Sequence, residues 1–113
     1  MELNALKPSR RRANVIKALA HTSRLLIVDM LSGHERCADE LTAVLGRDLL
    51  PASMHLRILE SAGIITGEKR GSSVYYSLRI PCILDFLRCV DRSAAGNKVV
   101  IATKPRIEEE LCE

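Results

Sequence analysis

Four cysteines are the residues of this 113-residue sequence with the clearest capacity for chemistry. They are Cys37, Cys82, Cys89 and Cys112. Thiolates bind soft ions and can also be oxidised to disulfides. The sequence begins without a signal-peptide pattern, and no apolar run approaches the ~18 residues of a membrane span. We therefore expect a cytoplasmic protein with no membrane partner, in which the thiols are reduced rather than joined in structural disulfides.

The spacing of Cys82 and Cys89 limits how they can bind one ion. They lie seven positions apart in one expected helix, a distance of roughly 10 Å along its axis. Two thiolates on a single ion, with metal–sulfur bonds of about 2.3 Å, lie within about 4 Å of each other. Three arrangements resolve this conflict: the helix begins after Cys82, Cys82 pairs with Cys89 of a second copy, or either meets Cys37. Each makes binding depend on helix or dimer geometry, as an allosteric switch requires.

Basic side chains form the second group with a functional pattern. The net charge is only +3, but its distribution is uneven: Arg10, Arg11 and Arg12 form a block, and Arg57, Lys69 and Arg70 flank the middle segments. Acidic residues gather at the C-terminal end, at Glu108, Glu109, Glu110 and Glu113. This distribution fits a polyanion-binding face, and an ordinary solvated surface is the alternative. No glycine-rich phosphate loop, catalytic carboxylate pair or Cys-His-Asn set is present, so we expect no enzyme.

Hydrophobic periodicity predicts a mostly α protein with one small β-hairpin. Residues 1–8 are expected to form a flexible arm, residues 9–95 one domain, and residues 96–113 a tail of uncertain structure. Helices are expected over about 9–20, 22–32, 37–45, 50–62 and 81–95. Strands over 64–66 and 74–78 flank a polar loop at 67–73. About five helices with a two-stranded basic hairpin predict a winged helix-turn-helix fold, in which one helix enters the DNA major groove.

The helix over 50–62 is the expected recognition helix. Ala52, Leu56 and Leu59 are predicted to face inward, and Ser53, Met54 and Arg57 outward. Arg57 is the best candidate for a guanine or phosphate contact, and Ser53 for a base edge or phosphate. The predicted DNA-binding residues are Ser53, Met54, His55, Arg57, Lys69 and Arg70. For His55, a phosphate contact competes with a plain helix-surface position; for Lys69 and Arg70, phosphate contacts compete with a solvated hairpin tip.

Five separated motifs resemble those of the ArsR/SmtB repressors, within a resemblance that spans residues about 15–92. They are ALAHTSRLLI from Ala18, ERCADEL from Glu35, SMHLRIL from Ser53, AGII from Ala62 and KRGSSVYYSL from Lys69. The resemblance implies a homodimer joined through its first and fifth helices, and a palindromic operator in double-stranded DNA that is released when a metal or metalloid ion binds. Two features depart from the family pattern: Asp39 replaces the second cysteine of the family's box, and Leu50-Pro51 open the recognition helix.

The ligand types narrow the inducer. Soft thiolates from Cys37, Cys82 and Cys89 favour As(III) or Sb(III), with arsenite preferred over Cd(II), Pb(II) or Zn(II). His21, His34 and His55 lie outside the fifth helix, so the carboxylate–histidine zinc site that some family members have there is expected to be absent. Alternative interpretations remain: small core cysteines at the dimer interface, a thiol-based redox or sulfide sensor, and a winged-helix protein-interaction module that does not bind DNA.

Overall fold

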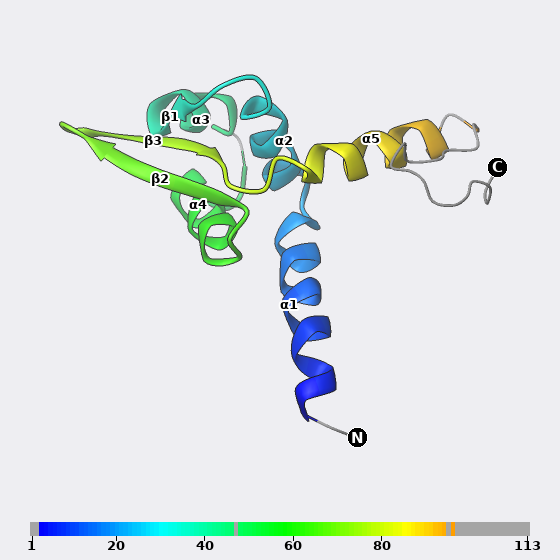
Figure 1. The fold of residues 1–113 in the computed structure, drawn as a ribbon. Coiled ribbons are helices and arrows are strands. Elements are labelled where there is room, and N and C mark those ends of the chain that lie inside the picture. The colour runs from blue at the N-terminus through cyan, green and yellow to red at the C-terminus, as the bar shows by residue number, and fades with distance from the viewer. Residues whose placement is uncertain (1–2, 47, 95, 97–113) are drawn as a thin grey trace. The chain divides into compact units, whose positions relative to one another are not determined.

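The computed structural model describes residues 3–46, 48–94 and 96, and the chain divides into two compact units, Met1–Pro81 and Cys82–Glu113. The first unit contains α1 (Leu3–Leu19), α2 (Thr22–Met30), β1 (Arg36–Cys37), α3 (Ala38–Val44), α4 (Ala52–Ser61), β2 (Ile65–Arg70) and β3 (Ser73–Leu78) (Figure 1). The second contains α5 (Ile83–Ala94). The expected domain over residues 9–95 therefore spans both units. The winged helix-turn-helix prediction is confirmed.

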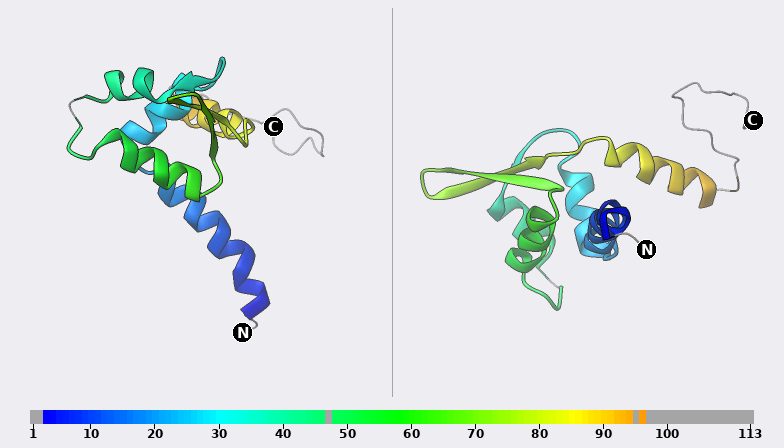
Figure 2. Two further views of the ribbon diagram at one scale, coloured as in Figure 1. Left: turned by 90° about the vertical axis from the view of Figure 1, so that its left-hand side faces the viewer. Right: turned by 60° about the horizontal axis from the view of Figure 1, so that its bottom comes forward.

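The core of the first unit lies between α2, α3, α4 and the start of the sheet. Its fully buried side chains include Ile27, Leu41, Leu59 and Ile64. Only the C-terminal end of α1 joins this core, through Ala18 and Leu19, and the rest of that helix extends beyond α2 and α4 (Figures 1 and 2). Burial of these aliphatic side chains fixes which face of each helix points outward.

A helix, and not the expected flexible arm, covers residues 3–8. Pro8 lies inside α1, where we expected it to end an irregular segment. Proline removes one backbone donor and is tolerated best near a helix N-terminus. Pro8 is the sixth residue of α1, so the helix loses only a bond close to its start.

No helix in the described part of the chain is long and apolar enough to cross a membrane.

The wing is a longer ribbon than its sequence predicted. Strands β2 and β3 pair antiparallel from Ile65↔Leu78 to Arg70↔Ser73, which leaves Gly71 and Ser72 as the loop. Gly71 has a φ of +64°, in the left-handed region that such two-residue loops require. Gly67, expected in the loop, lies inside β2, where a Cβ atom would come within 2.8 Å of the Tyr76 ring. The ribbon lacks an alternating apolar pattern, so the strands predicted from the sequence are shorter than those in the structure.

A third strand completes the sheet, whose order is β1-β3-β2. The two-residue strand β1 pairs antiparallel with β3, with Arg36 opposite Tyr76. A strand of two residues is too short to show an alternating apolar pattern, so the sequence did not predict it. This pairing anchors the wing to the segment that leads into α3, and so ties the hairpin to the helix-turn-helix.

Candidate nucleic-acid interface and ion sites

The exposed face of α4 carries the residues predicted to contact DNA. Pro51 precedes the helix with extended backbone (φ −65°, ψ 148°), so α4 begins at Ala52, slightly later than expected. Ala52, Leu56 and Leu59 are buried, as predicted. Ser53, Met54 and Arg57 are exposed, with Met54 at 39 %. A helix with one buried apolar face and one open face carrying a cation has the form needed to enter a major groove.

The placement of His55 on the DNA-facing surface was wrong. The side chain is 0 % exposed, and its Nε2 lies 2.7 Å from Oδ2 of Asp48. Position 55 falls three residues after Ala52 and four before Leu59, on the inward stripe of the helix. His55 therefore holds α4 to the rest of the fold. The DNA-facing surface of α4 has one residue fewer than the sequence predicted.

Asp48, in the loop between α3 and α4, organises the segment that enters the recognition helix. Its carboxylate accepts hydrogen bonds from the Ser23 hydroxyl and from the backbone N–H of Leu50 at 3.0 Å, and it pairs with His55. These contacts, led by the Ser23 hydroxyl, hold the pKa of Asp48 far below its usual value. An ionised Asp48 thus connects α2, the loop and α4.

His21 completes a cluster that sequence reasoning missed. It precedes α2 and accepts a hydrogen bond from the Ser23 N–H at its Nδ1, which caps that helix. Its ring centroid lies 4.6 Å from that of His55. One ligating atom from each of His21, Asp48 and His55 lies within 4.8 Å of the other two. Because 27 positions separate His21 from Asp48 in the sequence, only the tertiary fold brings the three together.

The charge of Arg70 on the wing is compensated within the chain. Its guanidinium donates to both carboxylate oxygens of Glu35, at 2.5 and 3.0 Å, and to Glu68 at 2.7 Å. It also lies 4.8 Å from the centroid of the Tyr75 ring. The hydrogen bonds to Glu35 and Glu68 raise the pKa of Arg70, and the bond to Arg70 lowers the pKa of Glu35. Lys69, also exposed, has no ion pair in the described part of the chain.

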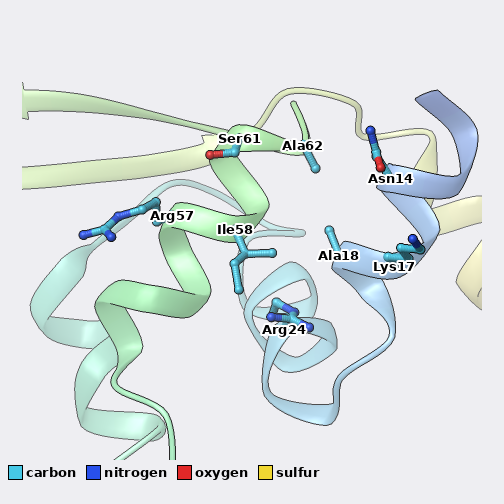
Figure 3. Close-up of a pocket in the computed structure, with 8 residues that line it drawn as sticks. All are labelled: Asn14, Lys17, Ala18, Arg24, Arg57, Ile58, Ser61 and Ala62. Carbon is cyan, nitrogen blue, oxygen red and sulfur yellow. The ribbon is translucent and has the colours of Figure 1, made fainter. Parts of the chain in front are cut away.

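A shallow depression lies where α1, α2 and α4 meet (Figure 3). It has a volume of about 500 Å³ and is open to solvent. Ala18, Ile58 and Ala62 supply apolar lining, and Lys17 and Arg24 supply charge. Arg57 also borders the depression, but its guanidinium points away from the other lining residues (Figure 3). This orientation leaves the charged end of Arg57 available to a partner on the open side of α4.

The three predicted ion ligands occupy both units. Cys37 precedes α3, where its backbone N–H donates to Glu40 at 2.9 Å, and it is half-buried. In the second unit, Cys82 is exposed in the turn before α5, and Cys89 is half-buried on α5. All three are free thiols. Cys112 lies outside the described residues. Because α5 begins at Ile83, Cys82 is not held within the helix that carries Cys89.

Comparison with known proteins places the chain in a family. Residues 21–66 match the model of the arsR family of bacterial regulatory proteins. An 80-residue segment is 35 % identical to the HTH-type transcriptional regulator YgaV of Escherichia coli, and the match covers 69 % of this chain and 81 % of that protein. The chain belongs to the arsR family. The relatives that resemble it are named as transcriptional regulators and repressors.

Other relatives agree with this assignment. The HTH-type transcriptional repressor SmtB of Mycobacterium tuberculosis is 41 % identical over 64 residues, a match that covers 57 % of this chain and 47 % of that protein. The chain thus spans about half the length of that repressor. A homodimeric winged helix-turn-helix DNA-binding domain of Mycobacterium bovis superimposes with a TM-score of 0.75 at 25 % identity, over 88 % of this chain and 96 % of that domain.

Proposed function

We propose that this arsR-family chain is a homodimeric repressor that binds a palindromic operator in double-stranded DNA and leaves it when a thiophilic ion binds. The observation that carries the proposal is the division of α4 into a buried apolar face and an exposed face with Ser53, Met54 and Arg57. Arg57 would contact a guanine or a phosphate, and Ser53 a base edge. Lys69 on the wing would contact a neighbouring phosphate.

The chemistry of α5 supports a homodimer. The helix has a strongly apolar side, yet none of its residues is buried. Phe86 is 52 % exposed and Val90 is 49 % exposed. An amphipathic helix with an unburied apolar side is stabilised by a partner surface. A second copy of α5 supplies such a surface, and a two-fold dimer would match the symmetry of a palindromic operator.

Cys37, Cys82 and Cys89 are the proposed inducer ligands. Arsenite is favoured over Cd(II), Pb(II) and Zn(II), because trivalent arsenic and antimony take three thiolates in a pyramid and the chain offers three thiols for one site. Cys82 lies directly before α5, where its carbonyl accepts a hydrogen bond from the Asp85 N–H at 3.1 Å, so sharing an ion with Cys89 would require the start of this helix to rearrange or a second copy to supply one thiolate. A reversible oxidation of the same free thiols is the second candidate signal.

A mobility-shift assay on the DNA upstream of the protein's own gene tests the proposal. We expect a retarded band with the reduced protein, and loss of that band on adding arsenite or antimonite at lower concentrations than cadmium, lead or zinc. Peroxide and sulfide, in separate lanes, test the redox alternative. Release by peroxide alone would replace the ion by oxidation as the signal. No retarded band on any upstream fragment would contradict the repressor assignment.

The replacement Glu35→Gln tests the role of the wing. The amide that it introduces is neutral and would free Arg70 from one of its two carboxylate partners. We expect operator affinity to rise by roughly threefold to tenfold at low salt, with a steeper loss of binding as salt increases. Asp29→Asn makes the same charge change on α2 and is the control. Equal effects of the two replacements, measured by fluorescence anisotropy over a salt series, would show that Arg70 gains no phosphate contact when Glu35 is neutral.

A further inference from the structure

We propose that His21, Asp48 and His55 form a second ion site, separate from the cysteines, that binds a borderline divalent cation such as Zn(II), Co(II) or Ni(II). Their ligating atoms lie within 4.8 Å of one another. Tetrahedral zinc with bonds of about 2.1 Å holds its ligands about 3.4 Å apart. The cluster would therefore reach ligating geometry by contracting by up to about 1.4 Å at its widest edge, while the short His55–Asp48 edge of 2.7 Å opens.

The state of the His55 ring supports a ligand role. Its Nδ1 is buried and has no hydrogen-bond partner in the described part of the chain. Buried polar atoms normally have partners, and an unpaired one is costly. When Nε2 donates to Asp48, the lone pair on Nδ1 is unused. A cation shared with Asp48 would bind at Nε2, the ring nitrogen that faces the carboxylate, and the ring proton would move from Nε2 to the unpaired Nδ1, so the imidazole stays neutral.

The charge and ligand types select the class of cation. A cation binds imidazoles in their neutral form, so with an ionised Asp48 the three ligands contribute one negative charge. Two nitrogens and one carboxylate oxygen suit Zn(II) and its neighbours in the first transition series, with a fourth position for water. Magnesium and calcium prefer all-oxygen sites. Trivalent arsenic requires thiolates, so the inducer proposed above would not compete for this site.

The position of the cluster links ion binding to the recognition helix. Its ligands come from the residue before α2, from the loop between α3 and α4, and from α4 itself. His21 now caps α2 through Nδ1. Ligation through Nδ1 uses that lone pair, and ligation through Nε2 places a proton on Nδ1, so either mode releases the cap. Occupancy would therefore alter how α4 is held against α2, and with it the affinity for DNA.

Cobalt binding to a cysteine-free protein tests this site. In a full-length variant with all four cysteines replaced by serine, we expect one Co(II) per chain, displaceable by Zn(II). The visible d–d bands should appear without the ultraviolet charge-transfer band of thiolate ligation. His21→Asn keeps a capping oxygen but removes the imidazole, and Asp48→Asn removes the charge. Each should weaken binding at least about tenfold, whereas His34→Asn, at an exposed histidine, should not.

Two results would overturn the proposal: a folded cysteine-free protein that binds neither Co(II) nor Zn(II), or equal affinities in the His21→Asn and His34→Asn variants. Circular dichroism checks the fold of each variant. If the cysteine-free chain unfolds, the same comparison is made with the cysteines intact, where His21→Asn should remove the visible bands of a nitrogen–oxygen site and leave the thiolate band. Loss of arsenite response would not accompany these changes, which separates this site from the inducer site.

Discussion

Replacing Arg57 by alanine is expected to weaken operator binding by about tenfold to a hundredfold at fixed salt. The guanidinium is exposed on α4, points away from the depression beside it (Figure 3), and has no ion pair in the described part of the chain. It is thus free to form the bidentate contact with guanine that carries about 1–3 kcal/mol of discrimination. Because the side chain is not buried, the stability of the fold should be unchanged. Fluorescence anisotropy with a labelled operator measures the loss.

Two further variants show whether Arg57 contacts a guanine or a phosphate, and whether the loss of any positive charge has the same effect. Arg57→Lys keeps the charge but loses the planar fork, so a guanine contact predicts weak binding for both Arg57 variants, and a phosphate contact predicts near-normal binding for lysine. Arg88→Ala removes the same charge from α5 and should have little effect. Unchanged affinity of Arg57→Ala for the operator would refute the assignment of α4 as the recognition helix and favour the protein-interaction module.

The variants Cys82→Ser and Cys89→Ser should bind the operator normally and fail to leave it when arsenite is added. Serine preserves size, so the fold and the DNA face should be retained. The hydroxyl is a hard, protonated group that does not replace a thiolate on a soft ion. Removing one of three thiolates should therefore raise the arsenite concentration needed for release by at least about a hundredfold. The mobility-shift assay with an arsenite titration reads both properties in one experiment.

Cys112→Ser is the matched control, because the proposed site does not use that residue. It should respond to arsenite as the unaltered protein does. Normal release by both the Cys82 and Cys89 variants would exclude the proposed inducer site at these cysteines and favour the alternative of small core cysteines at the dimer interface. Release by peroxide that is lost in the same variants, without any arsenite effect, would identify the thiols as a redox sensor.

Local sequence patterns were sufficient for the elements that present the DNA face. The burial of Ala52, Leu56 and Leu59 follows from their spacing on a helix, because a period of 3.6 residues places them on one side. The wing was predicted from β-branched and aromatic residues around a glycine turn. Its extent was not, because an exposed ribbon needs no apolar alternation. The part of α1 before residue 9 was not predicted, because proline often ends a helix. Pro8 is tolerated here because it lies near the N-terminus of α1.

Side-chain partnerships between separate segments were decided by the tertiary structure alone. The sequence determined that α4 has an outward cationic face and that the chain carries soft ligands. The fold decided that His55 is buried against Asp48, that His21 joins them, and that Glu35 pairs with Arg70. The buried face of a helix follows from the spacing of residues a few positions apart on one element, so the sequence alone predicts it. These contacts join different elements, and they form only because core packing brings α2, α4 and the wing to fixed positions.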